Sequence, residues 1–458
     1  AGAVVLKTVE NAQNNNNQIY ATIESIGVAH SVRPHAEGMV DAMAEALRLS
    51  GVTPDEIGFI SLSASGIEAE DEAEMFALSH IYDEATRDIA LISSKAIIGH
   101  SYNASGIASL IQSALVIYRR TIPVIPHFQA PKNEAFWRHL PFYFPNTTRP
   151  LFSDFFAQTY GAINIIGGDG GHAHIILSAH HSAYPSANLR YTVLPISGNS
   201  VDDLQARLTD LIAQLQNSTS VEAIQARAIH AYNEKHTFGG AIIGKNRAEL
   251  LSEAVSAQKG VLTAFEKGRD WESKIGSTFT AKPANGDVAL VYPGAFNAYV
   301  GMAGDLLQNF TQLSDISTLY ADSLRKLVAD KLIYPRTTHA MTDDEYTAYQ
   351  LALADNLPAM MQAGSTFAWQ YTRMVTLLGI QPKSMFGYSM GEASMMWGAG
   401  MWTHAHHASY LLQTSNLFTS KVVGKKTAAR HYLGDTTTPD DELWGNYVIA
   451  TDPDTVRQ

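Results

Sequence analysis

A serine between two glycines is the strongest chemical signal in this chain of 458 residues. Gly387, Ser389 and Gly391 fit the pattern G-x-S-x-G, in which small neighbours let the backbone turn sharply and expose the serine hydroxyl. Residues 383–386 are predicted to end a strand and residues 392–401 to begin a helix. The N-terminus of such a helix offers backbone N–H groups to an oxyanion. The pattern therefore predicts a nucleophilic serine; a purely structural Gly/Ser turn is the alternative.

The general base that this serine needs is not evident beside it. In this arrangement the catalytic histidine follows late in the chain. His404, His406 and His407 fall on the helix that leads away from Ser389, which leaves His431 as a further candidate. We therefore expect the general base to lie outside this chain.

Histidine pairs give a weaker signal for metal. His172 and His174 share a face if they lie on a strand, and His404 and His407 share a face of a helix. Spacing fixes no third ligand for either pair, so we expect ordinary core or surface histidines and no metal site. The chain has no Cys, which excludes disulfides, thiolate zinc sites and a cysteine nucleophile within it.

The composition is that of a folded protein with acidic balance. It is 46% hydrophobic and 17% charged, and the length corresponds to about three domains of roughly 150 residues. The formal net charge of −12 argues against partners such as nucleic acid or anionic membranes. No apolar run approaches the roughly 18 residues of a membrane span, and no signal-peptide pattern is present at the start. We expect a cytoplasmic protein without membrane insertion.

Hydrophobic periodicity predicts three successive α/β segments. In the first, strands are expected at 1–7, 19–27, 57–62 and, as a pair, within 161–177, with a turn at 14–17, helices at 35–49 and 107–117, and a solvated acidic helix start at 68–74. In the second, strands at 194–197 and 239–243 accompany helices at 201–215, 221–232 and 248–265. A polar linker over 279–287 precedes a strand at 288–292, which opens a third segment of alternating strand and helix.

These segments resemble a known series of synthase domains. Residues 1–178 resemble the C-terminal half of a ketosynthase-type, thiolase-fold domain, 190–280 resemble a ketosynthase–acyltransferase linker domain, and 288–458 resemble the first half of a malonyl-CoA:acyl-carrier-protein transacylase. The resemblance is strongest to the acyltransferase subunit of polyunsaturated (omega-3) fatty acid synthases. Residues 443–450 support this synthase type over modular polyketide synthases.

The resemblance implies an α/β protein of three parts. Residues 1–185 would be a partial thiolase-like domain that does not condense, and residues 186–287 a small α/β linker domain. Residues 288–458 would be the N-terminal part of an acyltransferase with an α/β-hydrolase-like core.

The ketosynthase resemblance implies a degenerate site. Active members use a cysteine and two histidines. When Asp71 and Glu74 are aligned on the family's D-x-x-E, Ser63 stands where the first histidine of E-A-H-G-T-G-T belongs. Lys95 and His100 keep the second histidine motif. One histidine replaced and one retained implies a partner without condensing activity.

The acyltransferase resemblance implies an oxyanion site built from backbone. The family opens with F-P-G-Q-G-S-Q, whereas this chain has Tyr292-Pro-Gly-Ala295 and lacks both glutamines. Because the oxyanion donors in such enzymes are backbone N–H groups, Ala295 and Met390 could still serve. The family's catalytic histidine falls beyond Gln458.

Substrate choice follows from the position of Thr414. An ungapped alignment from Ser389 places Thr414 where carboxylate-binding members carry Arg, and no Arg lies between Arg373 and Arg430. A neutral hydroxyl cannot balance a buried carboxylate. We therefore expect non-carboxylated acyl groups to be preferred over malonyl. The apolar side chains of Met395, Met396, Trp397 and Met401 are candidates for a hydrocarbon pocket, although core packing also suits them.

Three functions are compatible with these residues. The leading one is an acyltransferase that moves an acyl group between coenzyme A and carrier-protein thioesters through acyl-Ser389. The alternatives are a thioesterase-like hydrolase that releases the finished acid and a non-catalytic scaffold that docks carrier protein. No bound cofactor is expected. The implied substrates and partners are acyl-CoA, phosphopantetheine-carrying acyl carrier protein and other synthase subunits, with a homodimer through the ketosynthase-like region also compatible.

Overall fold

The computed structural model of the protein divides into two compact units. It describes residues 2–31, 36–152, 158–180, 189–217, 220–282, 286–295, 297–314, 324–440, 442–443 and 455. The first unit consists of Ala1–Ser186 together with Ala289–Gln458, and the second of Ala187–Val288. The division of the first unit into the two domains expected from sequence stays a prediction.

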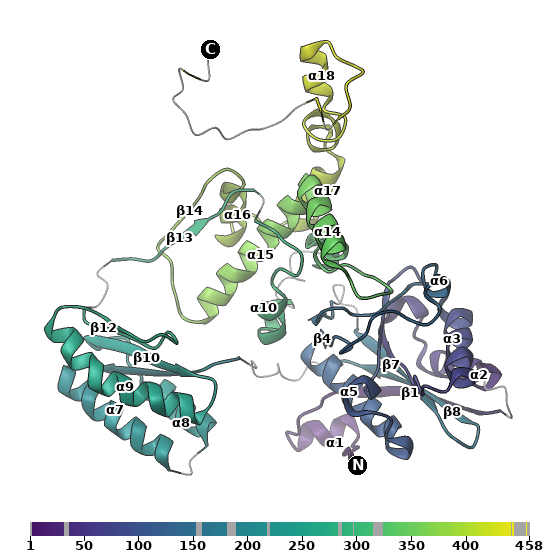
Figure 1. The fold of residues 1–458 in the computed structure, drawn as a ribbon, viewed down its shortest axis with the longest axis horizontal. Coiled ribbons are helices and arrows are strands. Elements are labelled where there is room, and N and C mark those ends of the chain that lie inside the picture. Colours follow the sequence, from purple (N-terminus) through teal and green to yellow (C-terminus); the bar gives the residue numbers. More distant parts are fainter. Residues whose placement is uncertain are drawn as a thin grey trace. The chain divides into compact units, whose positions relative to one another are not determined.

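The N-terminal part of the first unit is built on a six-stranded mixed sheet (Figure 1). Its strands are β1 (Thr22–His30), β2 (Ile57–Ser61), β3 (Ile89–Ile92), β5 (Phe142–Tyr143), β7 (Tyr160–Ile166) and β8 (Gly171–Ser178). They lie in the order β1-β8-β7-β2-β3-β5. The pairs β1/β8 and β8/β7 are antiparallel, and the other three pairs are parallel.

Helices cover both faces of this sheet. α2 (Ala36–Ser50) and α3 (Glu68–Tyr82) pack on one face, and α5 (Ser105–Arg119) packs on the other. The same part of the chain also contains α1 (Val9–Asn14), α4 (Lys95–Ile98), α6 (Glu134–Trp137) and the short turns η1 (Pro54–Glu56) and η2 (Tyr102–Ala104). Ile60 of β2 packs in one core with α2 and α3, whereas its neighbour Phe59 packs in a second core with α5. Burial on both faces is why β3 is continuously apolar and β2 carries only one polar side chain, that of Ser61. A separate antiparallel pair joins β4 (Thr121–Ile122) and β6 (Arg149–Pro150).

The predicted buried strand over residues 1–7 is wrong. Val5 is 86% exposed and Leu6 is 71% exposed, and no strand forms there. The sheet ends at β1, so this apolar run has no strand partner among the described residues. The predicted turn that follows is confirmed, since α1 ends at Asn14 and Asn16 adopts a φ of 50°.

The second unit is a four-stranded antiparallel sheet with three helices. The strands β9 (Thr192–Gly198), β10 (Phe238–Gly244), β11 (Trp271–Glu272) and β12 (Thr278–Thr280) lie in the order β11-β12-β10-β9. The helices are α7 (Val201–Gln216), α8 (Val221–Ala231) and α9 (Arg247–Glu266). The linker predicted from residue 279 begins too early, because Phe279 lies in β12 and is fully buried in the core.

The C-terminal part of the first unit contains a short parallel strand pair and a series of helices. The strands are β13 (Ala289–Tyr292) and β14 (Ser384–Gly387). The helices are α10 (Gly304–Asn309), α12 (Leu324–Leu327), α13 (Asp330–Ile333), α14 (Asp343–Asp355), α15 (Leu357–Leu377), α16 (Met390–Gly398), α17 (Ala405–Thr414), the π-helical turn η3 (Leu417–Lys421) and α18 (Thr427–Leu433). Within the described ranges, no helix combines the length and apolarity that crossing a membrane requires.

A segment around residue 337 ties the two parts of the first unit together. Phe144 N–H donates to Thr337 O at 3.0 Å, and the Arg149 guanidinium donates to Pro335 O at 2.5 Å. Asn146 also bonds to Thr337 through their side chains. These contacts join residues almost 200 positions apart, which is why the two parts form one compact unit.

Candidate functional site

Ser389 occupies a sharp turn between a strand and a helix. The predicted order of strand, turn and helix is confirmed, with β14 ending at Gly387 and α16 beginning at Met390, one and two residues from the predicted bounds. Ser389 itself has φ 56° and ψ −123°, a conformation that a residue with a Cβ rarely adopts. The side chain is exposed, and its hydroxyl has no hydrogen-bond partner among the described residues. The serine is therefore presented to solvent by a strained backbone.

The two glycines of the motif are required by close backbone approaches. A Cβ on Gly387 would lie 2.0 Å from the carbonyl carbon of Gly391, and a Cβ on Gly391 would lie 2.3 Å from Tyr292 O. Tyr292 is paired with Gly387 in the parallel β13/β14 register. Both strands therefore end at the same edge, and the chain leaving β13 passes beside the turn that holds the serine.

The structure brings the segments of both predicted oxyanion donors to this turn. A Cβ on Gly294 would lie 3.4 Å from Tyr388 O and 3.6 Å from Ser389 Cβ. Ala295 follows directly in the chain. Met390 opens α16, so its N–H belongs to the group at a helix start that has no partner within the helix. The roles of Ala295 and Met390 in binding an oxyanion stay predictions.

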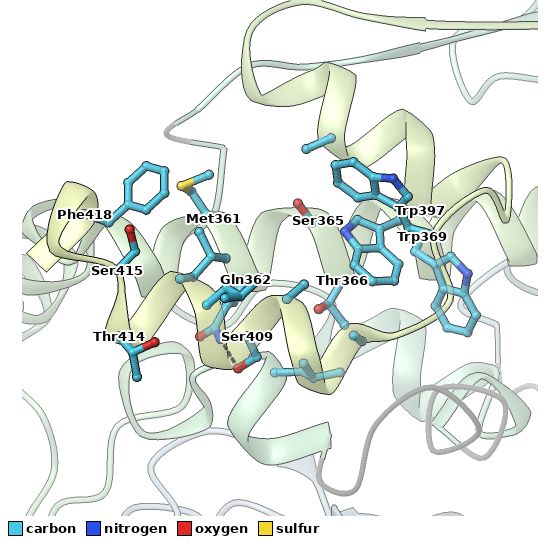
Figure 2. Close-up of a pocket in the computed structure, with 17 residues that line it drawn as sticks. Met361, Gln362, Ser365, Thr366, Trp369, Trp397, Ser409, Thr414, Ser415 and Phe418 are labelled. Atoms are coloured by element: carbon cyan, nitrogen blue, oxygen red, sulfur yellow. Dashed lines mark hydrogen bonds between the residues drawn. The ribbon is translucent and has the colours of Figure 1, made fainter.

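A cavity of about 610 Å³ lies between α15, α16 and α17 (Figure 2). Its lining is formed by Leu327, Met361, Gln362, Ser365, Thr366, Trp369, Ala393, Trp397, Trp402, Ala405, Ala408, Ser409, Leu411, Leu412, Thr414, Ser415 and Phe418. None of these side chains is charged. The cavity therefore suits an uncharged, largely apolar group.

The predicted selectivity residue lies in this cavity wall. Thr414 lines the cavity, and its hydroxyl donates to Tyr410 O at 2.7 Å within α17. The Thr414 hydroxyl proton therefore already takes part in a hydrogen bond within α17. Of the four apolar side chains predicted for a hydrocarbon pocket, only Trp397 lines the cavity. The sequence did not predict that side chains of α15 line this cavity, because no local pattern shows which face of α15 packs against α16.

In the N-terminal part, Ser63 and Lys95 lie together around a buried glutamate. Glu74 accepts hydrogen bonds from Ser63 N–H at 2.7 Å and Ala64 N–H at 2.8 Å. The Lys95 ammonium donates to Ser63 O. Burial raises the pKa of Glu74 against the effect of its hydrogen bonds, and burial lowers the pKa of Lys95 despite the nearby carboxylate. Glu74 therefore fixes the loop that carries Ser63, and it is not a solvated residue as the acidic run predicted.

A chain of hydrogen bonds continues from Glu74 into the core. Asn164 donates to Glu74 at 2.9 Å and contacts His174 Nδ1 at 2.6 Å, and His174 Nε2 contacts the Tyr82 hydroxyl at 3.1 Å. Burial lowers the pKa of His174 to about 3, so this histidine is neutral at ordinary pH. This network, which joins α3 to β7 and β8, was not predicted from the sequence.

His100 is the retained histidine of the ketosynthase-like motif, and its described contacts do not include this network. Its Nδ1 accepts from Tyr102 N–H at 3.0 Å, and the two rings stack at 5.0 Å. The structure therefore brings Ser63 and Lys95 into contact but shows His100 with Tyr102. The assignment of Ser63, Lys95 and His100 as a vestigial site stays a prediction.

The histidine pairs have ordinary partners. His172 Nε2 contacts the Ser31 hydroxyl at 3.1 Å, and His404 Nδ1 contacts the Thr403 hydroxyl at 3.1 Å. In the part of the chain that the structure describes, no three His, Asp or Glu side chains gather as metal ligands would.

Known proteins similar to this chain are synthases. Residues 20–129 match the family model of the beta-ketoacyl synthase C-terminal domain. The chain is 24% identical to a polyunsaturated fatty acid synthase protein of Thraustochytrium sp., covering 98% of this chain and 24% of that protein. It is 25% identical to the non-reducing polyketide synthase atnG of Arthrinium sp., covering 90% and 20% respectively. A ketosynthase of the bacillaene synthase from Bacillus amyloliquefaciens superposes on 56% of this chain and 46% of its own, with 22% identity and a TM-score of 0.37.

These matches bear on the two parts unequally. The matched range 20–129 contains Ser63, Lys95 and His100, so the predicted ketosynthase-type region is confirmed there. The similarity to a polyunsaturated fatty acid synthase and to polyketide synthases also agrees with the predicted resemblance. The chain spans only 20% and 24% of the length of the polyketide synthase and the fatty acid synthase protein named above. The segment with Ser389 lies outside the family-model match.

Proposed function

We propose that this chain is an acyl-transferring part of a polyunsaturated fatty acid or polyketide-type synthase, with Ser389 as the covalent acyl carrier. The observation that carries the proposal is the backbone of Ser389, which holds an exposed hydroxyl at the start of α16 with φ 56°. Strained positions of this kind concentrate at functional sites, and G-x-S-x-G serines use this geometry for nucleophilic attack.

The proposed reaction is a double displacement on a thioester. The Ser389 oxygen attacks the thioester carbonyl while its proton passes to a general base, and the tetrahedral oxyanion is held by the N–H groups of Ala295 and Met390. The C–S bond then breaks, and the thiolate leaves with a proton. Attack by the thiol of a second carrier reverses these steps and frees the serine. The general base, in this proposal, is a histidine supplied from outside the chain.

The proposed substrates are uncharged at the acyl end. The Thr414 side chain lies in the cavity wall, and its hydroxyl donates a hydrogen bond to the backbone carbonyl of Tyr410. The residues that line the cavity include no cation to pair with a carboxylate. An unpaired carboxylate is costly to bury. Acyl groups without a free carboxylate are therefore expected to load ahead of malonyl.

The ketosynthase-type part is proposed to be non-condensing. Condensation needs donors to an enolate oxygen, and the backbone of the Ser63 loop is already bound to Glu74 and Lys95. A serine side chain is also shorter than the imidazole that it replaces. The domain limits 1–185, 186–287 and 288–458 belong to this proposal.

The wider assignment also rests on the family resemblance. The proposed partners are acyl-CoA, phosphopantetheine-carrying acyl carrier protein and other synthase subunits, with a homodimer through the ketosynthase-type part. A cytoplasmic location and the absence of a bound cofactor are part of the same proposal.

A scaffold role is the second candidate, and two observations favour it. The Ser389 hydroxyl has no hydrogen-bonded base among the described residues, and the family's two glutamines near Ala295 are replaced. A scaffold would dock carrier protein without forming acyl-Ser389.

The test is intact-mass measurement of the chain after incubation with acetyl-, decanoyl- and malonyl-CoA, side by side. We expect slow formation of one adduct per chain, strongest with the two non-carboxylated donors and absent in Ser389→Ala. Added carrier protein with a phosphopantetheine thiol should then take the acyl group. Loss of the acyl group to water alone would indicate a hydrolase, and no adduct at Ser389 with any donor, even with imidazole added as an external base, would indicate a scaffold.

A further inference from the structure

The cavity between the C-terminal helices begins within one helical turn of Ser389. Ser389 directly precedes α16, and Ala393 and Trp397, four residues apart, lie along one face of that helix. Ala393 and Trp397 both line the cavity. Along α16, the rise from Met390, the residue after Ser389, is about 5 Å to Ala393 and about 11 Å to Trp397. The cavity thus runs along α16 away from the serine.

α15 borders the cavity in the same direction. A Cβ on Gly364 would lie 3.0 Å from the Met390 side chain, and the hydroxyls of Ser365 and Ser394 are 3.3 Å apart. Further on, a Cβ on Gly400 would lie 3.8 Å from the Arg373 guanidinium. The two helices therefore run side by side from the serine end to the far end.

Three tryptophans form the far end of the cavity. Trp397 and Trp402 meet edge to face with ring centroids 5.7 Å apart, and Trp369 completes the lining. Behind it, the Arg373 guanidinium lies 5.5 Å from the centre of the Trp369 ring. Figure 2 shows Trp369 and Trp397 at one end of the cavity and Thr414, Ser415 and Phe418 at the other. We call Trp369, Trp397 and Trp402 the tryptophan wall.

We propose that this cavity holds the hydrocarbon chain of the acyl group carried by Ser389, and that the tryptophan wall limits the chain length. This inference rests on the proposed function and narrows its substrate to acyl groups of medium chain length. The occupant is argued from three observations: the start of the cavity beside the first turn of α16, which follows Ser389, the uncharged lining, and the extent of about 11 Å along α16 to Trp397. Acetyl would leave most of the 610 Å³ unfilled.

Burial of each added methylene should strengthen binding by about fourfold until the chain reaches the wall. Beyond that length the affinity should stop rising, because further carbons would have to displace tryptophan rings or remain in water. Affinity plotted against acyl chain length should therefore rise and then level off.

The experiment uses S-alkyl-CoA thioethers with 2, 6, 10 and 14 carbons, which bind but cannot acylate a serine. Their affinities for the 458-residue chain are measured by isothermal titration calorimetry. Ala408→Trp fills the cavity from α17, and Ala393→Leu fills it from α16. His407→Trp is the matched control, because His407 is exposed on the same helix and does not line the cavity.

We expect at least a tenfold loss of decyl-CoA affinity in both filling variants and no loss in the control. Affinity independent of chain length, or unchanged by both filling variants, would overturn the proposal; so would a cavity found occupied by another segment or a second copy. Because thioether binding needs no acylation, an inert Ser389 would defeat the proposed function and leave this result intact.

The wall is tested with Trp402→Ala, since Trp402 is 44% exposed and its loss should not unfold the chain. The plateau should move to longer chains in this variant and stay in place in Trp402→Phe. If the affinity of Trp402→Ala levels off at the same chain length as that of the wild type, the tryptophan wall does not limit the length of the bound chain.

Discussion

Replacing Ser389 with glycine should stabilise the protein, whereas replacing it with alanine should not. The φ of 56° and ψ of −123° at Ser389 cost a residue with a Cβ on the order of 1–3 kcal/mol. Glycine adopts them freely, but its larger freedom in the unfolded chain costs about 0.5–1 kcal/mol. The net gain for Ser389→Gly should therefore reach up to about 2 kcal/mol. Alanine keeps the Cβ, and with it the strain, and loses only an exposed hydroxyl.

The assay is urea unfolding of wild type, Ser389→Gly and Ser389→Ala, followed by tryptophan fluorescence. Trp369, Trp397 and Trp402 report on the part that holds the serine, although the chain's two units need not unfold in one step. Both variants should lose acylation. Equal stability of the glycine and alanine variants, or a glycine variant less stable than wild type by about 1 kcal/mol or more, would refute a strained serine.

Three further predictions follow from other contacts. Gly391→Ala should destabilise the chain by about 1–3 kcal/mol, because the new Cβ would lie 2.3 Å from Tyr292 O at the end of β13. The control is Gly168→Ala, whose Cβ would meet nothing within 4 Å and should leave stability unchanged. The denaturant midpoints of the two variants are compared with that of the wild type. Glu74→Gln should cost about 1–3 kcal/mol in the same assay, because an amide cannot accept every N–H that the two carboxylate oxygens now accept. The His339 imidazole forms hydrogen bonds with the carboxylates of Glu345 and Glu134. These contacts, chiefly the one with Glu345, raise the pKa of His339. Its contribution to stability should be complete below about pH 6.5 and be lost as the pH rises through the raised pKa, a dependence that His339→Gln should flatten.

The serine turn could be predicted because its signal is local. Two glycines two residues from Ser389 determine that the chain can turn there, and the apolar residues before and after favour a strand and a helix. The structure adds what no local pattern contains, namely that Gly391 packs against the end of β13. That contact joins segments about 100 residues apart in the chain.

Glu74 shows why other parts could not be predicted. It lies in a run of acidic residues, which usually stays in solvent. The inner face of α3 is marked by Leu78, four residues later and fully buried, so the position of Glu74 relative to Leu78 was a usable signal. Its partner Asn164 lies 90 residues away, and only the folded sheet brings the two together.

The cavity was predicted only in part for the same reason. Trp397 was a candidate because it is one of the apolar residues that follow Ser389. Trp369 and Ala408 reach the cavity from helices whose orientation is decided by packing, such as the contact of Gly364 with Met390. Of the side chains named from the sequence, Trp397 lines the cavity, whereas Met395, Met396 and Met401 do not.

The most direct test of the central claim is peptide mapping of the chain after incubation with decanoyl-CoA. We predict a decanoyl ester on the peptide that contains Ser389, removed by hydroxylamine and absent from Ser389→Ala. A decanoyl group on any other residue at equal or greater yield, or none on Ser389 after prolonged incubation with imidazole added as an external base, would contradict an acyl-carrying serine.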